Sequence, residues 1–401
     1  MKAHTFDTGG LAVCPFMPVF GAPAVSMERG LGTELWDTDG KRYLDFLSGI
    51  AVVSLGHANP VIAEAISRQA STLLHVSNFF TNPQATAAAV KINELMLDAS
   101  GHAGQIFFTN SGAEANECAI KLARKFGGRG RHTVVSALGS FHGRTLATLA
   151  ATGQPAKHEP FSPMPEGFRH VVWGDLDALR ATVDGSVAAV LIEPIQGEGG
   201  VIPAPPGYLQ GVRALCDDLG ALMMVDEIQT GFARTGTWFA FEQAGVSPDV
   251  VTFAKAMGNG MPIGACWARA DVSAVFEPGD HGSTYSGTAI ATAAVGAVID
   301  EMRRIDAPSL AAAKGARLTE LLLAVPQIES VRGAGLLLGA QLVDGIDAPS
   351  IYKTLLAGGL ICNAVNSSTL RLLSPITVTD DELTEAVGKI AAALEAFEIP
   401  A

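Results

Sequence analysis

Seven short apolar runs between residues 105 and 268 alternate with segments of helical periodicity, and this alternation limits the folds open to the chain. The runs are rich in β-branched and other apolar residues, as buried strands are. They occupy residues 105–109, 132–137, 169–173, 187–193, 222–226, 250–254 and 263–268. Strands that alternate with helices along the chain predict a doubly wound α/β layer built on one broad sheet.

The two ends of the chain have a different pattern from this block. Residues 1–55 combine turns with short strands, and the dipeptide of Asp39 and Gly40 predicts a hairpin there. Residues 296–401 carry alanine- and leucine-rich helical patterns around a few short strands. Because 401 residues are too many for a single core, we expect both ends to form one smaller domain packed on the central one. We place the larger domain at residues 56–290 and the smaller at residues 1–55 and 291–401.

The charge balance argues against nucleic acid as a partner. The chain has 27 basic and 40 acidic residues, a formal net charge of −13, and no block of lysines and arginines. Its hydrophobic residues are spread evenly, without a run long enough to span a bilayer. We therefore expect a soluble protein that does not bind a membrane.

Cysteine usage and the N-terminus both favour a cytoplasmic protein. The five cysteines lie far apart and form no CxxC pair, which predicts neither a disulfide framework nor a metal site. They are Cys14, Cys118, Cys216, Cys266 and Cys362. The N-terminal segment has no apolar stretch before its prolines, so we expect no secretory signal.

One lysine, Lys255, ends an apolar strand-like run in the sequence VVTFAKAMGNGMPIGA. A second apolar run ends 29 residues upstream on Asp226 and is followed by Gln229. Asp226 thus supplies an acidic counterpart to the lysine on a neighbouring segment. A charged residue at the end of each of two apolar runs is the first indication of a site.

The pair of Lys255 and Asp226 suits a covalently bound cofactor. A desolvated amine has a lowered pKa and can attack an aldehyde to form a Schiff base. The ring of pyridoxal phosphate (PLP) also needs an acidic partner at its pyridine nitrogen, because protonation there makes the ring an electron sink. The local pattern leaves two interpretations of Lys255 open: a cofactor-binding lysine or an ordinary solvated surface lysine.

The segment FFTNSGAEANECAIKLARKFGG predicts a well-capped helix directly after the run at 105–109. Ser111 and Glu114 are expected to form a capping box at its start. The free amides of Gly112 and Ala113 would face the crevice above the sheet, where a helix start binds phosphate without a basic side chain. An ordinary capped helix is the alternative, and the segment alone favours it.

The segment ALGSFHGRTLAT follows the run at 132–137 and holds candidates for ligand binding. Phe141 could stack on a planar ring, and Arg144 could hold a carboxylate through two hydrogen bonds. His142 lies between them, and such a histidine is more often structural or stacking than catalytic.

Two carboxylates, Glu193 and Glu198, come at and after the end of the run at 187–193. Loop glutamates are usually just solvated, but a position at the carboxyl end of a strand suits a functional site equally well. Further on, the turn HGSTYSGT carries Ser283 and Thr284, whose hydroxyls could donate to a phosphate. Such hydroxyl residues are common in turns, so this last motif is weak in isolation.

In their order along the chain these segments resemble the class III PLP-dependent aminotransferases of the aspartate-aminotransferase-like fold. The matching segments are SGAEANE, FHGRT, EPIQGEGG, VDEIQTGFARTG, AKAMGNGMPIGA and HGSTYSG, and the resemblance covers nearly the whole chain. The short length, the segment LDFLSGIAVVSLGHANP and the HGSTY turn are most similar to the acetylornithine aminotransferases of arginine biosynthesis. The resemblance implies a PLP-dependent transferase of fold type I. This fold has a large domain with a mainly parallel seven-stranded sheet and a smaller α+β domain from both chain ends.

The resemblance also implies roles for the candidate residues. Lys255 would form the Schiff base and move the proton between substrate and cofactor, and Asp226 would pair with the pyridine nitrogen. The residue matching Thr284 completes the phosphate site from the other subunit, which implies a homodimer. The full set of implied cofactor-binding residues is Ser111, Gly112, Ala113, Phe141, Asp226, Gln229, Lys255 and Thr284.

The implied reaction moves the δ-amino group of N2-acetyl-L-ornithine to 2-oxoglutarate and gives N-acetylglutamate 5-semialdehyde and glutamate. Family logic assigns Arg371 to the α-carboxylate of glutamate and Arg144 to the distal carboxylate of either substrate. Acetylornithine has no carboxylate beside its reacting carbon, so Glu198 would then neutralise Arg371, because an unpaired buried guanidinium is costly. Ser283 would also line the acetylornithine pocket.

Two kinds of alternative stay open. Within the fold, the donor could be N-succinyl-diaminopimelate, ornithine or 4-aminobutyrate. Glu34 and Ile50 stand where ornithine-specific relatives tend to place aromatic residues, which counts against ornithine but does not separate the two acylated donors. Outside the fold, the sequence RGAGLLLGA at 332–340 suggests a nicotinamide-dependent dehydrogenase, although its glycine spacing misses GxGxxG by one residue.

Overall fold

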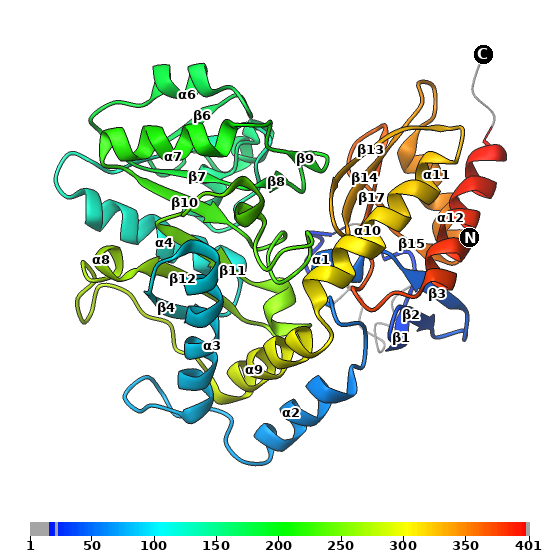
Figure 1. Cartoon of the computed structure of the whole chain (residues 1–401), viewed down its shortest axis with the longest axis horizontal. Coiled ribbons are helices and arrows are strands. Elements are labelled where there is room, and N and C mark those ends of the chain that lie inside the picture. The colour runs from blue at the N-terminus through cyan, green and yellow to red at the C-terminus, as the bar shows by residue number, and fades with distance from the viewer. Residues whose placement is uncertain (1–15, 21–22, 398–401) are drawn as a thin grey trace.

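The largest element of the fold is a seven-stranded sheet (Figure 1). The computed structural model describes residues 16–20 and 23–397. All strands of the sheet run parallel except β12, which is antiparallel to both neighbours. Each predicted run forms one strand whose ends lie within two residues of those predicted, and the predicted α/β sheet is confirmed. The order is β4 (Gly104–Thr109), β12 (Gly264–Arg269), β11 (Val250–Phe253), β10 (Leu222–Asp226), β7 (Val187–Ile192), β5 (Thr133–Ala137) and β6 (Phe168–Val171).

Helices bury this sheet on both faces. In β10, Leu222 and Met224 pack with α4 (Gly112–Gly127), whereas Met223 and Val225 pack in the other core with α7 (Tyr208–Leu219). Successive side chains of a strand point to opposite faces, so a strand buried on both sides reads as a continuous apolar run. The other helices of this region are α3 (Pro83–Ser100), α5 (Leu146–Ala151), α6 (Leu176–Thr182) and α8 (Ala270–Ser273).

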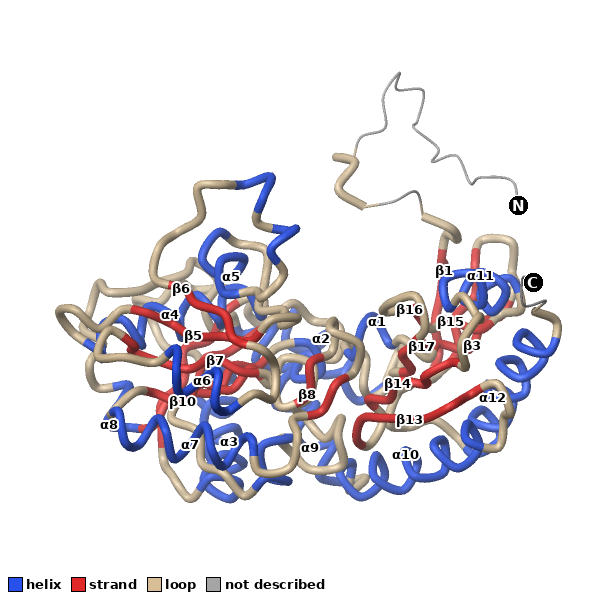
Figure 2. The backbone as a smooth tube through the Cα atoms, turned by 90° about the horizontal axis from the view of Figure 1, so that it is seen from above, coloured by secondary structure: helices blue, strands red, loops and turns tan. Residues whose placement is uncertain are grey.

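The two ends of the described chain share a second region, on the right of Figure 1 and Figure 2. Strand β3 pairs in parallel with β15, which joins N-terminal and C-terminal segments in one sheet. The predicted hairpin is confirmed: β2 and β3 are antiparallel, and Gly40 between them has a φ of +81°. One sheet contains β1 (Met27–Leu31), β2 (Glu34–Asp37), β3 (Arg42–Asp45) and β15 (Leu360–Ile361), and the other contains β13 (Ile328–Ala334), β14 (Leu337–Leu342), β17 (Thr369–Leu372) and β16 (Asn363–Ala364).

The helices of this second region are α10 (Ala307–Leu323), α11 (Ala348–Ala357) and α12 (Asp380–Glu395). Helix α9 (Ala289–Arg304) comes before them in the chain and packs against α2 (Pro60–Ala70) and α3. Both α2 and α3 begin at an Asn-Pro pair, in which the asparagine caps the helix and proline occupies its first position. Short elements near the junction are α1 (Ser48–Ala51), β8 (Ile195–Gln196) and β9 (Ile202–Pro203). The domain boundaries after residues 55 and 290 stay a prediction.

The sequence RGAGLLLGA does not form a dinucleotide-binding turn. It lies in the antiparallel hairpin of β13 and β14, where Gly333 and Gly335 have φ values of +120° and +52°. A dinucleotide fingerprint needs a helix after its first strand, and here a second strand follows. The dehydrogenase alternative is therefore wrong.

Two further sequence expectations concern membranes and cysteines. No helix in the described part of the chain is long and apolar enough to cross a membrane. Four cysteines of this part, Cys118, Cys216, Cys266 and Cys362, are buried free thiols. Cys14 and the N-terminal segment in which no secretory signal is expected fall mostly outside the described residues, as do residues 398–401 of the predicted smaller domain.

Candidate active site

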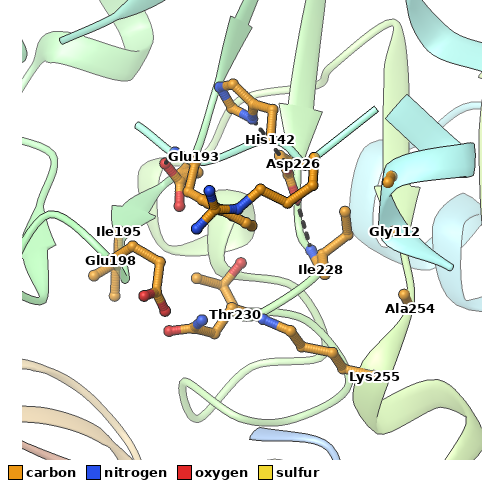
Figure 3. A pocket seen from close by; sticks show the side chains of 15 residues that line it. Gly112, His142, Glu193, Ile195, Glu198, Asp226, Ile228, Thr230, Ala254 and Lys255 are labelled. Carbon is orange, nitrogen blue, oxygen red and sulfur yellow. Dashed lines mark hydrogen bonds and ion pairs between the residues drawn. The ribbon is translucent and has the colours of Figure 1, made fainter. Parts of the chain in front are cut away.

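A cavity of about 240 Å³ lies at the carboxyl ends of the central strands (Figure 3). Asp226 ends β10, Glu193 follows β7, and Lys255 comes two residues after β11. Open α/β sheets bind ligands at this edge. The lining residues are Gly112, Ala113, Phe141, His142, Gly143, Arg144, Glu193, Ile195, Glu198, Asp226, Ile228, Gln229, Thr230, Ala254 and Lys255.

The side chain of Lys255 points into this cavity (Figure 3). Its backbone has a left-handed φ of +48° at the start of the 3-10 helix η4 (Lys255–Gly258). Burial lowers the pKa of Lys255, the carboxylate of Glu198 opposes this effect, and the charge of Arg371 adds to it. A lowered pKa favours the neutral amine, which is the nucleophilic form.

Asp226 is held by three groups that face its carboxylate. Asn116 Nδ2 donates to Oδ2 at 2.8 Å, and the Ile228 N–H donates to Oδ1 at 3.0 Å. The ring nitrogen Nδ1 of His142 lies 2.9 Å from Oδ2 and donates if it carries the proton. Asn116 in turn accepts a hydrogen bond of 2.8 Å from Thr252 on β11. The carboxylate therefore has a fixed orientation in an almost fully buried position.

Asn116 and Thr252 were not singled out from the sequence, although both carried a signal. Asn116 sits beside Ala115 on the apolar side of α4, and Thr252 interrupts the run VVTFA. A polar residue on a face that must be buried needs a partner there. Here Asn116 bonds directly to Asp226, and Thr252 bonds to Asn116.

Helix α4 begins at the cavity, and its cap differs in part from the prediction. Ser111 Oγ accepts the Glu114 N–H at 3.3 Å, as expected of an N-cap. The reciprocal half of the predicted capping box is wrong, because Glu114 accepts from the backbone and side-chain amides of Asn110 at 2.9 and 2.8 Å. Asn110 thus presents two N–H donors to one carboxylate oxygen, and Glu114 makes no hydrogen bond with the backbone N–H of Ser111 that a capping box requires.

The first residues of α4, Gly112 and Ala113, line the cavity, whereas Ser111 does not. A Cβ at Gly112 would lie 2.6 Å from Cδ1 of Ile228, so a larger residue here would require the Ile228 side chain or the helix start to move. The first amides of a helix have no partner within the helix, and they attract anions. This part of the cavity is therefore suited to a phosphate.

An ion pair between Arg371 and Glu198 links the two regions of the fold. Arg371 comes from β17, is almost fully buried, and donates from Nη1 to Glu198 Oε1 at 2.5 Å. It also donates to Gln229 Oε1 at 3.3 Å and, from Nε, to Asn363 Oδ1 at 3.0 Å. Burial alone would raise the pKa of Glu198, but the charge and hydrogen bond of Arg371, together with the charge of Lys255 and a hydrogen bond from Gln229, keep this pKa below its usual value. Glu198 and Gln229 line the cavity, and Arg371 lies behind them.

Glu193 connects two loops of the cavity wall. It accepts the N–H of Phe141 at 3.1 Å and that of Gly197 at 3.4 Å. Burial raises the pKa of Glu193 to about 7. This glutamate therefore ties the loop of Phe141 to the loop of Glu198.

Arg144 lies exposed at the rim of the cavity. The carbon Cζ of its guanidinium is 5.5 Å from the ring centre of Phe141, within the range of a cation–π contact. Ser283 and Thr284, in contrast, do not line the cavity of their own chain. Ser283 accepts hydrogen bonds from Asn110 at its hydroxyl and from Asn78 at its carbonyl, and Thr284 is exposed.

Known proteins similar to this chain are aminotransferases. The family model described as Aminotransferase class-III matches residues 19–394. The chain is 47% identical to the acetylornithine aminotransferase of Corynebacterium efficiens over 387 residues, which is 94% of either chain. It is 43% identical to that of Caldanaerobacter subterraneus, with 92% of this chain and 95% of the other covered.

Two solved structures of aminotransferases have backbones similar to that of this chain over most of its length. The N-acetylornithine aminotransferase of Stenotrophomonas maltophilia matches with a TM-score of 0.81 and 34% identity, covering 93% of this chain and 96% of that one. The ornithine aminotransferase of Toxoplasma gondii matches with a TM-score of 0.88 and 32% identity, covering 95% and 92%. Similar backbones thus occur in proteins named for different amines, so the amine must be distinguished by side chains of the site.

Proposed function

Because the chain belongs to the class III aminotransferases, we propose that it moves the δ-amino group of N2-acetyl-L-ornithine to 2-oxoglutarate with pyridoxal 5′-phosphate as cofactor. The products would be N-acetylglutamate 5-semialdehyde and glutamate, in a step of arginine biosynthesis. Relatives named acetylornithine aminotransferase at 43 and 47% identity support this donor. The ion pair of Arg371 with Glu198 carries the proposal, because it suits a site that must accept two different kinds of amine.

The cavity has the groups that this cofactor needs. Lys255 has a lowered pKa and no hydrogen bond to its amine among the described residues, which suits covalent attachment to an aldehyde. The amides of α4 would hold the phosphate, with Ser111 as the cap that orients them. Asp226 would face the pyridine nitrogen, Gln229 the ring hydroxyl and Phe141 the ring plane. When bound, PLP supplies an electron sink for the charge left on a carbon that loses its proton.

The proton transfer would be the work of Lys255. Its Nζ would take the proton from the reacting carbon of the donor and deliver it to the cofactor within the same half-reaction. The charge of Asp226 would stay fixed at the far side of the cavity, because Asn116 and Ile228 hold its carboxylate in one orientation.

The two amines place different demands on Arg371. Acetylornithine brings no carboxylate beside its reacting carbon, and Glu198 would then remain on Arg371 as its counter-charge. Glutamate brings an α-carboxylate, which would take the place of Glu198 on the guanidinium. Arg144 would hold the distal carboxylate of either substrate.

The site is proposed to need a second copy of the chain. The turn that carries Ser283 and Thr284 lies outside the cavity of its own chain, and Thr284 would complete the phosphate site of the partner. Large apolar side chains near this turn are exposed: Phe79 by 92%, Phe80 by 70% and Tyr285 by 60%. Exposed apolar residues of this size mark a contact surface. A homodimer would cover them.

A donor panel tests the proposed function. Purified enzyme loaded with PLP is expected to absorb visible light, and Lys255→Ala is expected to lose both the covalently bound cofactor and the activity. Transfer to 2-oxoglutarate is then measured from N2-acetyl-L-ornithine, N-succinyl-diaminopimelate, ornithine and 4-aminobutyrate. We expect the highest kcat/KM with N2-acetyl-L-ornithine. A higher value for any other donor contradicts the assignment.

A further inference from the structure

Two cations converge on one aromatic ring at the rim of the cavity. Arg144 Cζ lies 5.5 Å from the ring centre of Phe141, and Lys157 Nζ lies 5.4 Å from the same point. Lys157 ends the short 3-10 helix η1 (Pro155–Lys157), in the loop after α5. Segments separated along the chain thus bring two positive charges to one place.

Within the described residues, neither cation has an anionic partner in contact. Burial lowers the pKa of Lys157, the charge of Arg144 lowers it further, and the charge of Glu198 opposes both effects. Other lysines of this acidic chain are paired, for example Lys91 with Asp300 and Lys314 with Asp380. A half-buried cation beside a second one is unfavourable unless an anion binds there. The rim is therefore electrostatically prepared for a carboxylate.

We propose that Lys157 is a second binding residue, with Arg144, for the carboxylate at the far end of the amino donor. This inference rests on the proposed function. It adds that Lys157 contributes more to the binding of acetylornithine than to the binding of glutamate. In acetylornithine this carboxylate lies one carbon farther from the reacting carbon than the distal carboxylate of glutamate. Arg144 lines the cavity and Lys157 lies outside the lining, so the longer donor reaches the outer cation.

A purely structural role for Lys157 predicts a different result. Its aliphatic stem could simply cover the ring of Phe141, in which case the charge would not matter. Lys157→Met keeps an unbranched apolar stem without the charge, and Lys157→Arg keeps a charge. The two substitutions therefore separate packing from electrostatics. Lys353→Gln is the matched control, because Lys353 is an exposed lysine of α11, in the other region of the fold.

The experiment compares two donors that differ only in the carboxylate. N-Acetylputrescine has the amine and the acetamide of N2-acetyl-L-ornithine but lacks its carboxylate. For N2-acetyl-L-ornithine, Lys157→Met is expected to raise KM by about tenfold with little change in kcat, the loss of one charge-assisted contact. KM for N-acetylputrescine should not change, KM for glutamate should rise less, and Lys157→Arg should restore most of the affinity. Calorimetric titration with N-acetyl-L-norvaline, which has the carboxylate but no reacting amine, should show the same loss of about tenfold in binding.

Each outcome decides the inference. An unchanged KM for N2-acetyl-L-ornithine in Lys157→Met, or an equal rise for N-acetylputrescine, would overturn it and leave the proposed function intact. The same holds if Lys353→Gln matches the effect of Lys157→Met. If the unsubstituted enzyme does not use N2-acetyl-L-ornithine at all, the proposed function fails instead.

Discussion

Among single residues, Glu198 lines the cavity and pairs with the buried guanidinium of Arg371. Its removal is expected to change the rates of the two half-reactions by different factors. In Glu198→Ala, Arg371 keeps its buried charge but loses the carboxylate 2.5 Å away. Acetylornithine cannot replace that carboxylate, whereas glutamate can. We expect the acetylornithine half-reaction to slow by about tenfold or more relative to the glutamate half-reaction.

Single-turnover rates of the two half-reactions measure this ratio directly. Glu329→Ala, at an exposed glutamate of β13, is the control. If the ratio is the same in Glu198→Ala as in the unsubstituted enzyme, the proposed exchange of counter-charges is wrong.

The buried carboxyl of Glu193 gives a residue-scale prediction for pH. Burial raises the pKa of this group from 4.5 to about 7 in the folded protein. Below pH 4.5 both the folded and the unfolded chain hold the proton; between 4.5 and 7 the unfolded chain releases it first, so stability falls as pH rises. The loss attributable to Glu193 amounts to about 3 kcal/mol and is complete above pH 7.

Glu193→Gln removes this titration. Urea unfolding at a series of pH values is expected to show that the variant gains stability relative to the unsubstituted protein as pH rises from 4.5 to 7. Glu227, whose pKa burial also raises to about 7, keeps its own contribution in both proteins, so the pH dependence should shrink without vanishing. Parallel stability curves for the two proteins would refute the assignment.

At the scale of elements, the start of α4 depends on Gly112. In Gly112→Ala the new methyl group would lie 2.6 Å from Cδ1 of Ile228, so the Ile228 side chain or the first turn of the helix must shift at the cavity wall. We expect the affinity for PLP to fall by about tenfold, because this shift and the added methyl group disturb the wall that would face the phosphate. Cofactor titration of the apoenzyme, followed by its visible absorbance, measures the effect.

Gly388→Ala provides the matched control in a helix far from the cavity. Gly388 lies within α12, and a Cβ there would meet no atom within 4 Å. This substitution is expected to leave PLP affinity unchanged and to stabilise the protein by about 0.5–1 kcal/mol. Equal PLP affinities in the Gly112→Ala and unsubstituted proteins would show that cofactor binding does not depend on a glycine at the helix start.

Elements differ in how well their sequence predicts them. The inner strands of the large sheet are predictable because a strand buried on both faces must be apolar along its whole length, whereas the edge strands β4 and β6 are only partly buried and leave a weaker pattern. The cap of α4 was predicted only in part, since the choice of Glu114 between Ser111 and Asn110 depends on where the preceding turn places the asparagine amide. RGAGLLLGA was ambiguous because a glycine pattern does not say whether a helix or a strand follows.

At the scale of the whole molecule, Arg234 ties together segments from both ends and the middle of the chain. It is fully buried and donates to the carbonyls of Leu336 and Ser374 and, at 2.7 Å, to the hydroxyl of Ser54. Arg234→Met would leave these acceptors without this donor. We expect the free energy of unfolding to fall by about 3 kcal/mol or more.

Urea unfolding of Arg234→Met is the measurement, with Arg129→Met as the control at an exposed arginine. The control is expected to change stability by less than about 0.5 kcal/mol. Equal unfolding midpoints for the two variants would show that the junction does not depend on Arg234.

The sequence by itself determined the sheet, the family resemblance and the residues around Lys255. The reason is that buried strands need apolar runs and that the motifs occur in a recognisable order along the chain. Only the tertiary structure decided which distant side chains meet. The bond between Arg371 and Glu198 joins residues from two regions of the fold, and the hold of Asn116 on Asp226 joins a helix to a strand. The convergence of Lys157 and Arg144 on Phe141 is of the same kind. The physical reason is that charge and hydrogen bonding act across space over a few ångströms, and the fold alone sets those distances.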